Sequence, residues 1–180
     1  MSLRAEVVAA AREMHRLGLV VGTAGNVSAR EGEGLVITPA ALAYADMTEV
    51  DLVALPAGGS RDPSSEWRVH DAIYAARRDV GAIVHTHSVH ATAWSCLAEP
   101  LDTQIKEFTQ AVGGPVLTAA DAPPGSDELA ANAVAAVGEL NGALLYRHGV
   151  LALGESPARA LVVAQVIERH AQMAFLLRQR

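Results

Sequence analysis

Hydrophobic residues recur at helical spacing in several parts of the chain. Leu3, Val7, Ala10, Met14 and Leu17 are three or four positions apart, which is typical of a helix with one apolar face. Further segments combine this spacing with start signals such as Pro157 or with a run of alanines. The pattern predicts helices at residues 2–18, 63–78, 89–98, 127–140 and 157–180.

Short apolar or alternating runs lie between these helices and are bounded by glycine, proline or asparagine. They predict strands at residues 27–30, 35–38, 51–55, 81–87, 142–146 and 150–153. The segment 101–120 favours neither state, because Gly113, Gly114 and Pro115 interrupt it. Helices that bracket several short strands, without a repeat or a linker, indicate one α/β domain over residues 1–180.

The composition narrows the class of protein. Residues are 51% hydrophobic but only 4% aromatic, so alanine, valine and leucine must fill the core. The net charge of −6 argues against a nucleic-acid partner. We also expect no membrane partner, because no polybasic run, signal sequence or stretch of roughly 18 apolar residues is evident. Cys96 is the single cysteine, which fits a reducing, cytoplasmic location.

The segment His85-Thr86-His87 ends the predicted strand 81–87. Residues two apart on a strand point to the same side, so both imidazoles are expected to converge. Imidazole nitrogen suits a divalent metal such as zinc, and a catalytic zinc commonly has three protein ligands. His148, at the end of another predicted strand, is a candidate third ligand. There are structural alternatives to a metal site. His85 and His87 can be hydrogen-bonded residues at the end of a strand, and His148 can be an ordinary turn histidine.

Glu66 and His70 are four residues apart and are expected to share a helix face. A hydrogen bond on the helix surface is the interpretation that this spacing favours by itself.

Glycine and serine segments predict a second feature, an anion subsite. Gly25 and Asn26 offer backbone N–H groups and an amide, while Ser64 and Ser65 are expected at a helix N-terminus. Each is also common as a turn or a helix cap. Together they suggest a site for phosphate or carboxylate.

The ordered series TAGNVS, ITP, PSSEW, HTHSVH and RHGV resembles the class II aldolase/adducin family over nearly the whole chain. The PSSEW stretch is most similar to the L-fuculose-1-phosphate aldolase branch. The resemblance implies a three-layer fold with a nine-stranded, mostly antiparallel sheet flanked by helices. It also implies a homotetramer whose active sites lie at subunit interfaces.

Matching motif positions imply that His85, His87 and His148 bind the metal, with Zn²⁺ as the default and Mn²⁺ or Co²⁺ as alternatives. Glu66 is implied as the catalytic acid/base, and it can also ligate the metal ion when no substrate is bound. The implied reaction is cleavage of a small ketose phosphate, or a related hydroxylated carbonyl compound or sugar acid, through a metal-stabilised enediolate. Gly25, Asn26, Ser64 and Ser65 are implied as the phosphate subsite.

Two departures from that branch affect substrate recognition. A threonine–glycine pair that helps to hold phosphate is replaced by Ala40 and Ala41. A tyrosine implicated in proton transfer to the leaving aldehyde is replaced by Glu107, which is therefore a second candidate catalytic residue. Both changes predict that L-fuculose 1-phosphate is a poor substrate.

Other activities of the family are the alternatives: ribulose-phosphate 4-epimerase, sugar-phosphate dehydratase and sugar-acid-phosphate decarboxylase. Glu66 favours the aldolase, because the epimerases tend to have aspartate at that position. A non-catalytic scaffold like the adducin head domain is disfavoured by the complete set of histidines.

Overall fold

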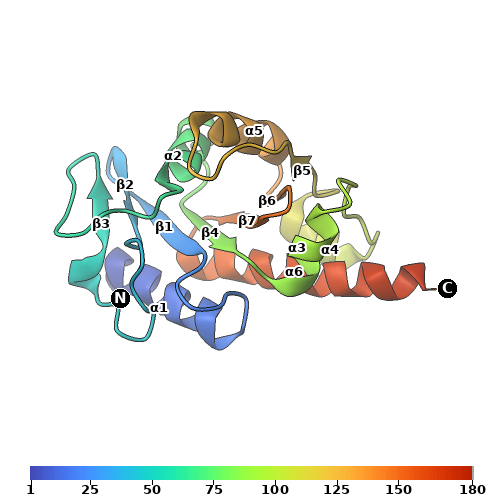
Figure 1. The fold of residues 1–180 in the computed structure, drawn as a ribbon, viewed down its shortest axis with the longest axis horizontal. Helices are drawn as coiled ribbons and strands as arrows, with labels where there is room; N and C mark the ends of the chain where they lie inside the picture. The colour runs from blue at the N-terminus through green and yellow to red at the C-terminus, as the bar shows by residue number, and fades with distance from the viewer. Residues whose placement is uncertain (180) are drawn as a thin grey trace.

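A mostly antiparallel sheet runs through the middle of the molecule and separates two layers of helices (Figure 1). The computed structural model describes residues 1–179. Within that range the strands are β1 (Asn26–Glu31), β2 (Gly34–Ile37), β3 (Val53–Leu55), β4 (Ala82–Thr86), β5 (Thr118–Ala119), β6 (Gly142–Leu145) and β7 (Gly149–Gly154). Their order in the sheet is β3-β2-β1-β4-β7-β6-β5, and only the β5–β6 pair is parallel.

The helices of the same part of the chain are α1 (Leu3–Arg16), α2 (Trp67–Ala76), α3 (Val89–Ser95), α4 (Lys106–Val112), α5 (Asp127–Val137) and α6 (Pro157–Arg178), with one 3-10 turn at Glu49–Asp51. Helices α1, α3 and α6 cover one face of the sheet, and α2 and α5 cover the other (Figure 1). The predicted α/β class and the three-layer arrangement are therefore confirmed.

The central strand β4 serves both layers because its side chains alternate between them. Ala82 and Val84 pack in the core beneath α1 and α6, whereas Ile83 packs in the core beneath α2 and α5. By the same alternation His85 faces the α2 side. The predicted metal ligand His85 therefore lies on the side of the sheet that α2 covers.

Helix α2 begins later than predicted. Its first residue is Trp67 and its N-cap is Glu66, so Ser64 and Ser65 precede the helix instead of capping it. The reason is a long-range pairing: Ser64 N–H donates to the Thr38 carbonyl oxygen at 3.1 Å, which keeps the chain extended up to that point.

Three other expectations differ from the structure. The described residues form seven strands and not nine, because contacts such as Pro39–Pro63 and Leu101–Val116 are single bridges. A proline has no N–H to donate, which stops the first of these from growing into a ladder. The segment 101–120 contains α4 and β5. The last helix ends at Arg178, and Arg180 lies outside the described residues.

Helix α6 also qualifies the expectation about apolar stretches. By length and hydropathy alone it could cross a membrane, but half of its most apolar window is buried within the protein. Its buried residues include Val163, Ala164 and Ile167, which belong to the core beneath the sheet. This is the behaviour of a core helix.

Candidate active site

Three histidines converge at one end of the central strands. His85 is the fourth residue of β4, His87 follows two positions later, and His148 lies in the turn between β6 and β7. One ligand atom from each lies within 4.8 Å of the other two. The structure therefore brings together the three side chains that were predicted as metal ligands.

His148 reaches this cluster through a tight turn and a close strand pairing. Its N–H donates to the Leu145 carbonyl oxygen at 3.0 Å, and Arg147 just before it has a left-handed φ of 53°. A Cβ on Gly149 would overlap the Thr86 carbonyl oxygen and would lie 3.1 Å from both the His85 and His87 rings. A glycine is thus required where β7 passes the histidines.

Hydrogen bonding determines which nitrogen of His85 is free. Its Nδ1 lies 2.9 Å from the Val150 carbonyl oxygen, which can only accept, so Nδ1 must carry the hydrogen. The Nε2 atom is then an unprotonated donor of a lone pair, as in many metal-binding histidines. His87 Nε2 lies 2.9 Å away from it.

Glu66 completes the cluster from the N-terminal end of α2. Its Oε1 lies 2.8 Å from His148 Nε2, and its Oε2 lies 3.1 Å from His85 Nε2. Within residues 1–179, this buried Oε2 has no hydrogen-bond donor. Two lone-pair atoms, Oε2 and the unprotonated Nε2 of His85, therefore face each other in a buried place. A cation between them would resolve the conflict, and three imidazoles with one carboxylate are donors that suit a divalent transition metal.

The protonation states match that interpretation. Burial would raise the pKa of Glu66, but the adjacent His85, a hydrogen bond from His148 and its charge together hold the pKa at about 2. Burial, assisted by the neighbouring histidines, lowers the pKa of His87 to about 4. Near neutral pH the carboxylate is ionised and the imidazole is neutral, which are the forms that bind metals.

A pocket of about 190 Å³ opens beside the histidines. It is lined by Thr23, Ala24, Gly25, Asn26, Pro39, Ala40, Ala41, Ser64, Ser65, Glu66, His85 and His87. The four residues predicted for an anion subsite, Gly25, Asn26, Ser64 and Ser65, are all among them. We refer to this hollow as the anion pocket.

The polar groups of the anion pocket leave donors available. Ser64 Oγ accepts from Asn26 Nδ2 at 3.0 Å and from the Glu66 N–H at 3.4 Å, so its own hydrogen is free to donate. Gly25 has a φ of 75°, and a Cβ there would come within 2.6 Å of the His85 carbonyl oxygen. The glycine therefore lets the loop pass directly over the end of β4.

Ala41, which lines this pocket, adopts an unfavourable backbone conformation. It has a left-handed φ of 56°, a conformation that favours glycine and penalises any residue with a Cβ. A glycine would adopt this backbone conformation without that strain.

We expect Ala41→Gly to stabilise the protein by about 0.5–1 kcal/mol, because relief of the Cβ strain exceeds the added freedom of the unfolded chain. Denaturant unfolding monitored by circular dichroism measures this. Ala43→Gly is the matched control, since Ala43 is an exposed residue of the same loop without a positive φ, and there glycine should destabilise. Equal destabilisation by both changes would contradict the strain at Ala41.

His70 belongs to a buried hydrogen-bond network on the α2 side of the sheet. The prediction of a helix-surface hydrogen bond with Glu66 is wrong, because His70 is fully buried and its Nδ1 lies 2.7 Å from Ser28 Oγ. Ser28 Oγ in turn lies 2.8 Å from the Tyr74 hydroxyl. Burial, with His85 acting in the same direction, lowers the pKa of His70 to about 3. The spacing of four residues from Glu66 was a signal of proximity, but only the packing of α2 on the sheet reveals the burial.

Glu107 lies apart from this group. It is on α4, its side chain is 53% exposed, and its carboxylate is 3.6 Å from His170 Nε2. It is not among the residues that line the anion pocket. Within the described protomer the structure does not bring it to the histidine cluster, so its catalytic role stays a prediction that needs a neighbouring subunit.

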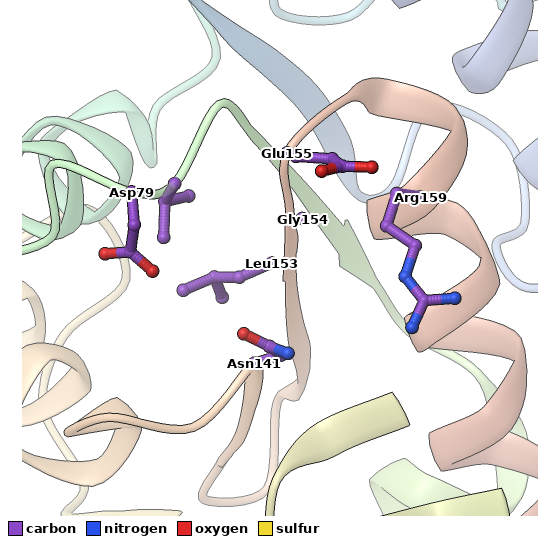
Figure 2. A pocket seen from close by; sticks show the side chains of 7 residues that line it. Asp79, Asn141, Leu153, Gly154, Glu155 and Arg159 are labelled. Carbon is purple, nitrogen blue, oxygen red and sulfur yellow. The ribbon is translucent and has the colours of Figure 1, made fainter. Parts of the chain in front are cut away.

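A larger hollow of about 280 Å³ lies at the opposite end of β7. Figure 2 shows Asp79 and Arg159 on either side of the strand that ends at Gly154, with Glu155 beyond it. Asp79 is already paired with Arg77 at 2.7 Å. The acidic and basic side chains that line this hollow do not converge on one point, whereas the three histidines do.

Comparison with known proteins agrees with the geometry. The family described as the class II aldolase and adducin N-terminal domain matches residues 5–175. A 5-methylthioribulose-1-phosphate/5-deoxyribulose-1-phosphate aldolase from Rhodospirillum rubrum is 40% identical over 175 residues, which cover 95% of this chain and 79% of the relative. The L-fuculose phosphate aldolase of Escherichia coli K12 is 37% identical, with 95% and 81% covered.

A solved structure of an L-fuculose 1-phosphate aldolase superimposes with a TM-score of 0.93 at 31% identity. The match covers 98% of this chain and 86% of that one. The similarity therefore extends over the sheet and both helical layers.

Proposed function

This chain belongs to the class II aldolase and adducin family, and from that premise we propose that it is a metal-dependent aldehyde-lyase that splits a small ketose 1-phosphate. Its relatives are named aldolases, and class II aldolases depend on divalent metals. The assignment of individual residues to that reaction, the identity of the metal and the choice of substrate are our proposals.

One observation carries the proposal: the buried Oε2 of Glu66 faces the unprotonated Nε2 of His85 at 3.1 Å. A protein gains nothing from two buried acceptors in contact. With His87 and His148 beside them, these atoms would hold one divalent ion, for which zinc is our first choice and Mn²⁺ or Co²⁺ the alternatives. Such an ion supplies Lewis-acid stabilisation of the negative charge that develops on substrate oxygen.

The protons of a cleavage reaction must balance. The hydroxyl on the carbon that becomes the aldehyde loses a proton, the carbon–carbon bond breaks, and its electron pair stays on the ketone fragment. That fragment then takes up a proton at carbon. We assign the transfer at carbon to Glu66, which borders both the histidines and the anion pocket, and the transfer at the aldehyde oxygen to Glu107 of a neighbouring subunit.

The anion pocket supports recognition of the phosphate. Ser64 offers its hydroxyl hydrogen, Asn26 has a second amide hydrogen, and the loop at Gly25 lies close to the end of β4. The relative from Rhodospirillum rubrum and the solved aldolase structure are both named for ketose 1-phosphates. Because Ala40 and Ala41 remove a hydroxyl and add a Cβ at the rim, we propose that L-fuculose 1-phosphate is cleaved less well than 5-deoxyribulose 1-phosphate.

A substrate panel tests the proposal. L-Fuculose 1-phosphate, 5-deoxyribulose 1-phosphate, 5-methylthioribulose 1-phosphate and the free ketoses would be incubated with protein reconstituted with Zn²⁺, Mn²⁺ or Co²⁺. Release of the three-carbon ketone phosphate is measured, and we expect kcat/KM above about 10⁴ M⁻¹s⁻¹ for the preferred compound. Preference for L-fuculose 1-phosphate would overturn the substrate assignment. Inversion of a stereocentre without cleavage would replace the aldolase by an epimerase.

We also propose a homotetramer, since Glu107 can serve the histidine cluster only from another subunit. Exposed apolar side chains such as Val89 at 70% and Leu176 at 58% are compatible with burial between subunits. Light scattering at micromolar concentration should give four times the mass of one chain. A monomer would contradict an active site built across an interface. A cytoplasmic location likewise stays a prediction.

A further inference from the structure

His170 is a buried polar residue that the reaction described above does not use. It lies on α6 with no exposed surface, and its ring centre is 4.9 Å from that of Phe108 on α4. A histidine in an apolar layer needs hydrogen-bond partners for both ring nitrogens. The partners of these two nitrogens indicate its role.

The Nδ1 atom has a clear partner. Thr103 Oγ1 lies 2.7 Å from it, and a hydroxyl can donate its hydrogen to an unprotonated ring nitrogen. If Nδ1 accepts, then Nε2 carries the hydrogen of the neutral ring. Burial lowers the pKa of His170, and the neighbouring Arg169 acts in the same direction although Glu107 opposes it, so the ring is neutral near pH 7.

The Nε2 atom points toward the one carboxylate near it in the described part of the chain. Glu107 Oε2 is 3.6 Å away, and Nε2 has no hydrogen bond to any of residues 1–179. That distance is longer than a hydrogen bond, but the Glu107 side chain is 53% exposed and has room to change its rotamer. Catalytic contacts often tighten only when substrate is bound.

We propose that His170 is a positioning residue that holds the Glu107 carboxylate through Nε2–H, in a chain that starts at the Thr103 hydroxyl. This inference rests on the proposed function, in which Glu107 transfers a proton at the aldehyde oxygen. An unrestrained glutamate on an exposed helix loses rotamer freedom whenever it must adopt one geometry. A hydrogen bond from a buried, immobile ring selects that geometry in advance.

Three variants test the chain of contacts. His170→Leu removes both nitrogens at similar volume, and we expect kcat to fall about tenfold with KM unchanged, as for loss of one hydrogen bond to a charged group. His170→Gln places an amide N–H near the position of Nε2 and should recover most of the activity. In a Glu107→Gln background, His170→Leu should have no further effect.

A purely structural histidine would behave differently. Replacing such a histidine by leucine would lower thermal stability equally in the wild type and in Glu107→Gln, and its effect on kcat would add to that of Glu107→Gln. Such additivity, or full activity of His170→Leu, would overturn the inference. If Glu107→Gln itself keeps full activity while Glu66→Gln does not, the inference fails and the proposed aldolase stands.

Nuclear magnetic resonance gives a result that does not depend on any substrate. In the metal-loaded wild type we expect the Nε2–H tautomer of His170 at pH 7, and Glu107→Gln should lower the pKa of His170 because an anionic partner is lost. The Nδ1–H tautomer, or a titration unchanged by Glu107→Gln, would overturn the inference even if the substrate panel identifies no substrate.

Discussion

Replacing His87 by alanine is expected to abolish metal-dependent cleavage, with kcat/KM lower by about 10³-fold or more, because the ion supplies the main stabilisation of developing charge. His87 is the ligand to test first. It is only partly buried, whereas His85 is completely buried in the sheet and its replacement could unfold the protein. Metal content by elemental analysis and activity before and after reconstitution are the measurements.

The control is His15→Ala, which removes an exposed histidine from α1 and should change neither metal content nor activity. Chelation of the wild type should reproduce the loss of activity, and added divalent ion should restore it. If His87→Ala binds one ion per chain with unchanged affinity, the proposed metal site lies elsewhere.

Replacing Glu66 by glutamine is expected to lower kcat by about 10²–10⁴-fold while the fold is retained, since general acid–base catalysis contributes about that much. The amide keeps the shape of the side chain but has no basic oxygen. In the metal-free protein its NH₂ group can donate to the unprotonated Nε2 of His85, so the variant should be no less stable than the wild type. Steady-state kinetics and thermal unfolding measure both effects.

Glu128→Gln is the matched control, because Glu128 is an exposed glutamate in the first turn of another helix, α5. It should leave kcat unchanged. Near-normal turnover of Glu66→Gln with metal retained would move the acid/base elsewhere, and Glu107 would be tested next.

Sequence patterns did not predict which positions have a strained backbone or an unusually close contact. The resemblance to the aldolase branch implies a glycine at position 41, but the left-handed φ of Ala41 is known only from the structure. Gly149 appears as an ordinary turn glycine, yet the absence of its Cβ lets β7 pass the two histidine rings. For Gly149 the cause is the close approach of β7 to the end of β4, two segments that are distant in the chain.

The sequence by itself determined the helical periods, most strands and the convergence of His85 with His87, because these depend on neighbours a few residues apart. Its ordered motifs also indicated the family. Only the tertiary structure decided that His148 and Glu66 meet that pair, that His70 is buried, and that α2 begins at Trp67. Those features depend on the register of β4 with β7 and on the bridging of Ser64 to Thr38. Pairings between distant segments leave no periodic trace in the sequence, since each is selected by the packing of the whole sheet.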